Sequence, residues 1–186
     1  MNKQLIKLAE ITLLMLEKRS WHSIKIDEVY NETNINKKKI QNKVNNKLDL
    51  LRNINHYFDY KLLNITDSID KSTRKDMIFE IIMMRFDILQ IHRKPIIKIF
   101  EFFKKKPQEL VFLLPSLIES MISMAGLAKI PVVGIKGNLK VKGLLVIYFS
   151  SFLVWAKDNT ESLEKTMTSL DNHLDRAGKL LSIIKI

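Results

Sequence analysis

Apolar residues recur at helical spacing along almost the whole chain, and this pattern constrains the fold more than any other feature. A helix at about residues 2–19 would have an apolar face made of Leu5, Leu8, Ile11, Leu14 and Met15. Glycine and proline are few, at five and four of 186 residues, and no segment alternates as a β-strand would. The sequence therefore predicts an all-α protein with about nine helices.

The first third of the chain contains two short helices joined by a tight turn. They are expected at residues 27–33 and 37–43. Asn34 suits the turn because asparagine enters the left-handed conformation at lower cost than most residues. Asn46 and Asp49 then have the spacing of a capping box at the start of a longer helix.

Longer and more apolar helices follow toward the C-terminus. They are expected at 74–92, 95–106, 107–125, 139–157 and 161–184, with a loop over 129–138 and a stop at Gly126. The helix at 139–157 is apolar nearly all round, which predicts burial on most sides. The last helix has a narrow seam suited to helix packing, made of Leu163, Met167, Leu170, Leu174, Ala177, Leu181 and Ile184.

Composition restricts the class of function. The net charge is +11, from 31 basic and 20 acidic residues, which favours nucleic acid or an anionic membrane as a partner. The chain has no cysteine, so thiolate catalysis is excluded. The longest nearly apolar run, 143–156, falls short of the roughly 20 residues of a membrane span. Because Lys3 and Lys7 also interrupt the N-terminus, we expect a cytoplasmic protein.

Catalysis is not expected, because no nucleophile motif, glycine-rich phosphate loop or paired carboxylates are present. No metal-ligand spacing joins His22, His56, His92 and His173, so neither a metal nor another cofactor is predicted.

A lysine cluster lies over the second short helix. Five lysines occur with no acid until Asp49: Lys37, Lys38, Lys39, Lys43 and Lys47. Three of them begin the helix, where the helix dipole disfavours positive charge. Lysines that destabilise the helix on which they lie indicate a function, and phosphate is the natural partner of such a cluster.

Residues 19–51 resemble the DNA-binding domain of TetR-family transcriptional regulators. The residues in register with the family pattern are Trp21, Val29, Ile35, Asn36, Lys37, Ile40, Val44, Asn46, Lys47, Asp49 and Leu50. The resemblance implies a helix-turn-helix domain over 1–50, with 36–43 in the major groove, and a helical ligand-binding and dimerisation domain over 51–186. The implied DNA contacts are Lys25, Asn36, Lys37, Lys38, Lys39, Gln41, Asn42, Lys43 and Lys47.

The chain departs from the family pattern at several positions. Tyr30 stands where the family usually has alanine, and Asn34 replaces the turn glycine. Gln41 and Lys43 replace an aromatic pair. The bulk of Tyr30 favours a wider spacing of the two short helices. The departures therefore leave the TetR-like fold better supported than sequence-specific DNA binding.

Residues of about 80–180 carry a second resemblance, to the C-terminal part of alphaproteobacterial TetR-like proteins and the related coenzyme Q biosynthesis accessory protein. It rests on 85–93, 154–158, 166–167 and 170–171. It implies an alternative function, a lipid- or isoprenoid-binding accessory protein of ubiquinone biosynthesis without specific DNA binding. A third alternative is a nonspecific basic protein on nucleic acid or membrane.

The C-terminal helices contain the candidate ligand and partner surfaces. An apolar ligand pocket or, equally, a packed core would be formed by Met83, Phe86, Met121, Met124, Phe149, Phe152 and Trp155. The resemblance implies a homodimer through helices 139–157 and 161–184. The run at 102–106 (FFKKK) suits either peripheral membrane contact or a lysine-capped helix end.

Overall fold

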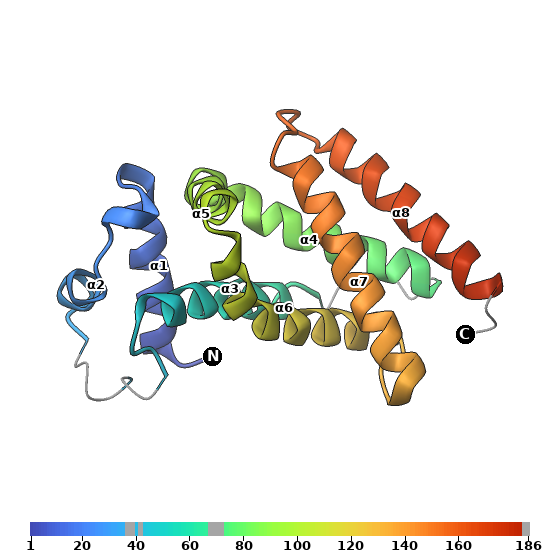
Figure 1. Cartoon of the computed structure of the whole chain (residues 1–186), viewed down its shortest axis with the longest axis horizontal. Coiled ribbons are helices and arrows are strands. Elements are labelled where there is room, and N and C mark those ends of the chain that lie inside the picture. The colour runs from blue at the N-terminus through green and yellow to red at the C-terminus, as the bar shows by residue number, and fades with distance from the viewer. Residues whose placement is uncertain (36–39, 41–42, 67–72, 184–186) are drawn as a thin grey trace. The chain divides into compact units, whose positions relative to one another are not determined.

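The computed structural model describes residues 1–35, 40, 43–66 and 73–183, and over these residues the chain is all-helical (Figure 1). This confirms the predicted class. The order of elements is α1 (Lys3–Lys18), η1 (Trp21–Ser23, a 3₁₀ helix), α2 (Ile26–Thr33), α3 (Lys47–Leu63), α4 (Arg74–Ile91), α5 (Arg93–Lys105), α6 (Pro107–Leu127), α7 (Gly134–Trp155) and α8 (Glu164–Ile183).

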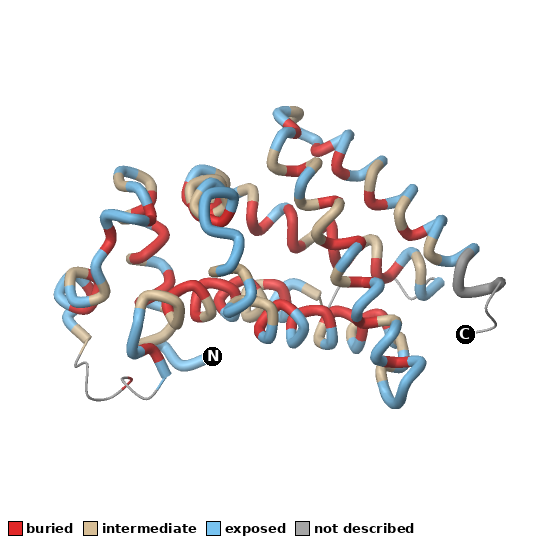
Figure 2. Tube along the Cα trace, viewed as in Figure 1, coloured by how far each residue is buried: buried red, intermediate tan, exposed pale blue. Residues whose placement is uncertain are grey.

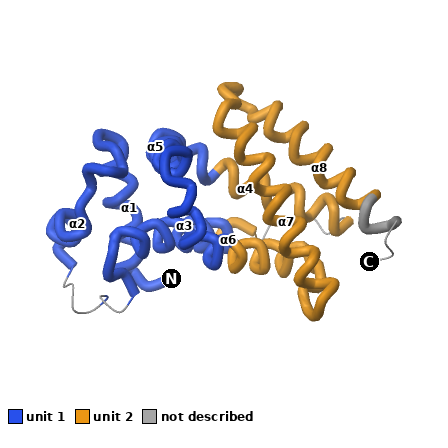
Figure 3. Tube along the Cα trace, viewed as in Figure 1, with its two compact units in different colours: residues 1–63, 88–117 blue, residues 64–87, 118–186 orange. Residues whose placement is uncertain are grey.

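The chain divides into two compact units (Figure 3). Unit 1 comprises residues 1–63 and 88–117, and unit 2 comprises 64–87 and 118–186. These units are defined by packing, so the functional boundary expected at residue 50 stays a prediction. All predicted DNA contacts belong to the sequence of unit 1, and all predicted ligand contacts to that of unit 2.

Unit 1 is built around α1, which packs against α2, α3 and α5. The buried residues of α1, drawn in red in Figure 2, include Leu8, Leu13 and Leu16. The predicted apolar face was wrong in part, because Leu14 is 60% exposed and Leu8 is the one fully buried member of that face. A hydrogen bond also joins α3 to α1, because Asn53 Nδ2 donates to the Leu5 carbonyl at 2.9 Å. The central position of α1 fixes the helices that precede and follow the lysine cluster.

In unit 2, helix α7 packs against α8, and a surface ion pair joins α8 to α4. Lys75 of α4 places its Nζ 2.8 Å from Asp171 and 2.5 Å from Asp175, both on α8. Part of the predicted seam is buried, namely Leu170 and Leu174 of α8 and Leu163, which directly precedes α8. Met167 of the same seam is exposed.

Two glycines near which the sequence suggested helix breaks, Gly126 and Gly137, lie inside α6 and α7. Gly126 lies within α6, which ends in a left-handed Lys129 (φ 55°), with the Ile130 N–H donating to the Ala125 carbonyl at 2.8 Å. The loop expected over 129–138 is shorter, because α7 begins at Gly134. The predictions failed here because glycine was interpreted as a helix breaker. α5 also begins before the expected Pro95, which occupies its first turn, where no N–H is needed.

The helix α7 is not buried on most sides within one chain, contrary to the prediction. Leu139, Val146 and Leu153 are exposed along it, and Val146 is 65% exposed. By length and composition both α6 and α7 could cross a membrane, with mean hydropathies of 1.8 and 1.3. Core helices of soluble proteins pass the same test, so this observation is weak evidence for a span.

Candidate nucleic-acid interface

The turn after α2 has the geometry that the sequence predicts. Asn34 adopts the left-handed conformation, with φ 52° and ψ 29°, and its N–H donates to the Asn31 carbonyl. Thr33 Oγ1 donates to the Tyr30 carbonyl at 2.8 Å, which satisfies a carbonyl in the last turn of the helix. Asparagine therefore replaces the usual turn glycine without loss of the tight turn.

Tyr30 connects α2 to the segment that precedes α3. Its ring is buried, and its hydroxyl donates to the Val44 carbonyl at 2.5 Å. A phenol can therefore occupy this position because its polar end finds a backbone acceptor. The sequence interpretation treated Tyr30 only as excess bulk and missed this bond.

We expect Tyr30→Phe to lower the free energy of unfolding by about 1–2 kcal/mol, because the buried Val44 carbonyl loses a donor while the ring packing is kept. Urea denaturation followed by circular dichroism measures this change. Tyr60→Phe, on the half-buried face of α3, serves as the control. Equal stability of the Tyr30 variant and the wild type would contradict a structural role for this bond.

The segment between α2 and α3 is anchored at two apolar positions. Ile40 and Val44 are buried, and the N–H groups of Lys43 and Val44 both donate to the Ile40 carbonyl, at 2.9 and 3.0 Å. Most of the helix predicted at 37–43 lies outside the described residues. Lys43 is exposed, and Lys25 is exposed at the N-cap of α2. The other predicted contacts in this segment lie outside the described residues: Asn36, Lys37, Lys38, Lys39, Gln41 and Asn42.

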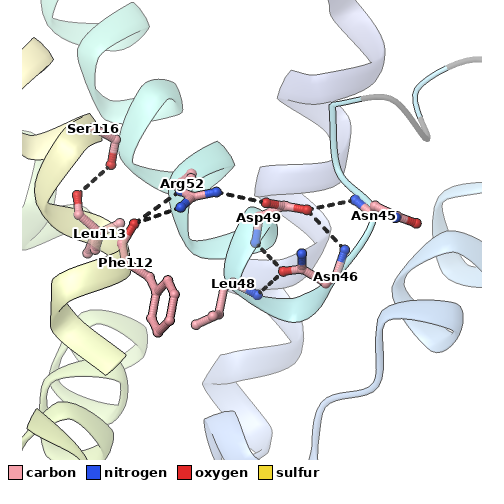
Figure 4. Close-up of polar contacts among 8 residues, drawn as sticks. All are labelled: Asn45, Asn46, Leu48, Asp49, Arg52, Phe112, Leu113 and Ser116. Atoms are coloured by element: carbon pink, nitrogen blue, oxygen red, sulfur yellow. Dashed lines mark hydrogen bonds and ion pairs between the residues drawn. The ribbon is translucent and has the colours of Figure 1, made fainter. Parts of the chain in front are cut away.

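A capping box starts α3, as predicted (Figure 4). Asn46 Oδ1 accepts from the N–H groups of Leu48 and Asp49, at 2.8 and 3.0 Å. In return, Asp49 Oδ2 accepts from the N–H groups of Asn46 and Asn45, at 3.1 and 3.0 Å. Four backbone donors are satisfied, so the start of this helix is closely defined.

The Asp49 carboxylate also binds Arg52, and Arg52 in turn donates hydrogen bonds to α6 (Figure 4). Arg52 Nη1 lies 3.1 Å from Asp49 Oδ1, while its Nε and Nη2 donate to the Phe112 carbonyl at 3.1 and 3.0 Å. Phe112 precedes Pro115, a helix-interior proline that perturbs this stretch of backbone bonding. Asn55 adds a second bond, from its Nδ2 to the Ser116 carbonyl at 3.1 Å.

Lys47, a predicted phosphate contact, lies against η1. Its Nζ donates to the His22 carbonyl at 3.1 Å and lies 4.8 Å from the centre of the Trp21 ring. Burial, with the nearby charges of Arg19 and Lys106, lowers the pKa of Lys47. The side chain is half-buried, so Trp21 and His22 position it at the start of α3.

Lys98 of α5 caps the C-terminus of α1, a contact that no local sequence signal predicts. Its Nζ donates to the carbonyls of Leu16, Glu17 and Arg19, at 2.6, 3.1 and 3.1 Å. Carbonyls at a helix C-terminus lack donors within the helix, and a cation there complements the helix dipole. Arg19 in turn pairs with Glu28 of α2 at 2.7 Å, so α5, α1 and α2 are tied by polar contacts.

The predicted ligand residues fall into a buried group and an outer pair within unit 2. The buried group consists of Met83, Phe86, Met121, Met124 and Trp155. Phe149 and Phe152 are half-buried, and the ring of Phe152 lies 5.2 Å from that of Trp155. A shallow depression elsewhere on α8 contains none of them; it is lined by Glu164, Lys165, Thr168, Ser169 and Asn172.

Comparison with solved structures identifies the fold. The chain has the fold of the TetR transcriptional regulators. The crystal structure of the TetR transcriptional regulator from Nitrosomonas europaea ATCC 19718 superposes with a TM-score of 0.72, over 95% of this chain and 99% of that one. The two sequences are 16% identical. No protein-family model and no curated protein matches the sequence.

Proposed function

We propose that the chain is a TetR-like transcriptional regulator that binds double-stranded DNA as a homodimer and responds to a small apolar ligand. It would act in the cytoplasm and catalyse no reaction. Its DNA contacts would come from the lysine cluster at 37–47 and from Lys25. The observation that carries this proposal is the anchored segment between α2 and α3 within a TetR fold.

The anchoring supports DNA binding because a recognition segment needs a rigid frame. Asn34 sets the turn before the segment, and Ile40 and Val44 hold it to the core of unit 1. The capping box at Asn46 then fixes the start of α3, where Lys47 lies. Exposed Lys25 and Lys43 add charge on either side, which suits phosphate contacts.

The exposed face of α7 supports a homodimer. Leu139, Val146 and Leu153 form an apolar stripe on a helix whose opposite face packs in unit 2. An apolar stripe of this kind favours burial against a second copy, together with α8 and its exposed Met167. Analytical ultracentrifugation of the full chain should give twice the mass of 21.8 kDa; a monomer at micromolar concentration would contradict this part.

The helix α6 offers a route from ligand to DNA. Its second half carries Met121 and Met124, and its first half carries the Phe112 carbonyl that Arg52 of α3 binds. A ligand that displaces α6 would therefore act on the helix that begins at Lys47. Ligand control would be a population shift between DNA-competent and incompetent states.

The lipid-accessory alternative drew support from Tyr30 as an obstacle to helix-turn-helix packing. The bond from Tyr30 to Val44 gives that residue a role in holding the segment. No contact among the described residues favours a ubiquinone-related function, and we do not propose it.

A salt series on the DNA upstream of the protein's own gene tests the proposal. Replacing Lys37, Lys38 and Lys39 with alanine should make the negative slope of log K against log salt shallower by about 2–3. Binding would then neutralise fewer phosphates and release fewer counterions. Electrophoretic shift at several salt concentrations measures the slope.

The control carries the same charge change in unit 2, at exposed Lys136, Lys157 and Lys165, and should leave the slope nearly unchanged. Equal slopes for the two triple variants would show that charge alone drives binding. Absence of affinity above that for competitor DNA at about 0.15 M salt would refute the regulator proposal.

A further inference from the structure

The connection between α6 and α7 exposes two large apolar side chains, which form an apolar tip of unit 2. Val133 and Ile135 are each 90% exposed, the highest fraction of any large apolar side chain that the structure describes. Most of residues 131–136 are exposed as well, and this connection is largely pale blue in Figure 2. Single apolar side chains are common on protein surfaces, so the function of the tip depends on how it is held and what surrounds it.

Backbone contacts on both sides hold the apolar tip in place. α6 ends in the left-handed Lys129, and the Ile130 N–H donates to the Ala125 carbonyl at 2.8 Å. Gly137, in the first turn of α7, approaches Val132 so closely that a Cβ would lie 2.0 Å from the Val132 carbonyl carbon. The tip is therefore presented by a fixed backbone, and a partner would bind it at little cost in ordering the chain.

The sequence around the apolar tip is basic. Lys129 and Lys142 are exposed on either side of it, and Lys140 is half-buried. No acidic residue occurs between Glu119 and Asp158. A lysine side chain can lay its apolar stem along a surface while its ammonium group reaches outward. Exposed apolar side chains flanked by such cations complement a surface that is anionic outside and apolar beneath.

We propose that the apolar tip inserts into the interface of an anionic phospholipid membrane, with Lys129, Lys140 and Lys142 against the lipid phosphates. Both tip side chains are almost fully exposed, so no surrounding groove is formed to receive a side chain of a partner protein. A lipid interface needs no such groove. A contact of this kind lies on the bilayer and requires no helix to span it. The proposal goes beyond DNA binding and does not depend on it.

The charge of the tip disfavours a second copy of the chain as its occupant. A two-fold contact brings the same patch of both copies together, so lysines near the tip would face the same lysines of the second copy. Like charges placed opposite each other are destabilising. The apolar stripe proposed above for the homodimer begins at Leu139, beyond the tip.

The other basic and aromatic run, at 102–106, is less suited to membrane insertion in the structure than in the sequence. Phe103 is buried, and the ring of Phe102 lies 6.4 Å from that of Trp21 in an edge contact. Lys104 pairs with Glu101 at 2.7 Å. Because both rings of this run pack within unit 1, its exposed groups are mainly the lysines.

Flotation of the full chain with lipid vesicles tests the proposal. Phosphatidylcholine vesicles with about one-third phosphatidylglycerol should bind the chain at least about tenfold more tightly than phosphatidylcholine alone, since each lysine near an anionic surface contributes a factor of about five. Val133→Ser combined with Ile135→Ser should weaken binding to the anionic vesicles at least about tenfold, because it removes the apolar insertion and keeps every charge.

Ile91→Ser combined with Val111→Ser is the matched control, with the same two changes at exposed positions of unit 1. This variant should bind the anionic vesicles as the wild type does. Failure of the wild type to bind them, or equal binding by the tip variant and the wild type, would overturn the proposal.

A fluorescent label reports insertion directly. The chain has no cysteine, so Val133→Cys provides a single attachment point for an environment-sensitive fluorophore. Its emission should shift to shorter wavelength when anionic vesicles are added, whereas a label at Val111→Cys should not respond. Equal shifts at both positions would overturn the assigned site. A shift that depends on protein concentration without vesicles would assign the tip to a second copy and refute the membrane contact.

Discussion

Replacing Asp158 with alanine is expected to lower the free energy of unfolding by about 3–4 kcal/mol, because several buried donors lose a charged acceptor together. Asp158 Oδ1 accepts from Thr160 N and Oγ1, at 3.1 and 2.6 Å. Its Oδ2 accepts from Thr166 N and Oγ1, both at 2.8 Å. The carboxylate therefore holds the connection between α7 and the first turn of α8.

The connection contains a strained residue that the carboxylate helps to hold. Leu163 is buried with φ 53°, a left-handed conformation that costs a leucine about 1–2 kcal/mol. Urea denaturation measures the loss in the alanine variant. Asp171→Ala is the control, since that carboxylate is half exposed and forms a surface ion pair with Lys75; its loss should cost less than about 1 kcal/mol. Similar losses in both variants would contradict a special role for Asp158.

The same carboxylate predicts a pH dependence. Burial alone would raise the pKa of Asp158, but the hydrogen bonds from Thr160 and Thr166 outweigh burial and hold the pKa well below its usual range. Its stabilising contribution is therefore complete above the unfolded-state pKa of about 3.9 and is lost as pH falls below that value. Asp158→Asn should flatten the fall in unfolding free energy below about pH 4. Parallel profiles for wild type and variant would contradict this assignment.

Local signals in the sequence predicted the frame of the candidate interface well. The left-handed Asn34 and the capping box of Asn46 and Asp49 depend on residues within one helical turn, so their spacing alone was sufficient. The helices themselves followed from apolar periodicity for the same reason. The roles of individual predicted DNA and ligand contacts stay predictions.

Contacts between distant segments were beyond sequence reasoning. The bond from Tyr30 to Val44 and the capping of α1 by Lys98 join residues 14 and about 80 positions apart. Their existence depends on how helices pack, which composition and periodicity do not specify. The fold explains Tyr30 in a way that its side-chain volume did not, because the hydroxyl has an acceptor. A residue that departs from a family pattern can therefore be part of a different but equally satisfied arrangement.

Glycines were the other source of error in the predicted helix ends. A glycine in a helix can be required by a close backbone contact, or it can lie in open space where alanine would also fit. Gly126 lies in α6 with open space where a Cβ would point. Gly137 lies in α7 with a Cβ position 2.0 Å from the carbonyl carbon of Val132. Only the second is required by close approach of the backbone. Neither ends a helix, although the sequence suggested a break near both.

Gly137→Ala is accordingly expected to lower the free energy of unfolding by at least about 3 kcal/mol, at the upper end for overpacking. The added Cβ would meet the carbon, oxygen and Cα of Val132, at 2.0, 2.2 and 2.6 Å, and backbone atoms cannot move aside as a side chain can. Either the segment before α7 or the first turn of α7 must shift.

Gly126→Ala is the matched control, because its new methyl group meets no atom within 4 Å. Removal of glycine from a helix should leave that variant equally stable or more stable by up to about 1 kcal/mol. In thermal and urea unfolding, the Gly137 variant should therefore be less stable than the wild type and the Gly126 variant should not be. If Gly137→Ala unfolds like the wild type, the contact of α7 with Val132 is not as tight as the structure indicates. Because α7 also carries the proposed dimer face, the Gly137 variant should show weakened self-association at concentrations where the Gly126 variant remains dimeric.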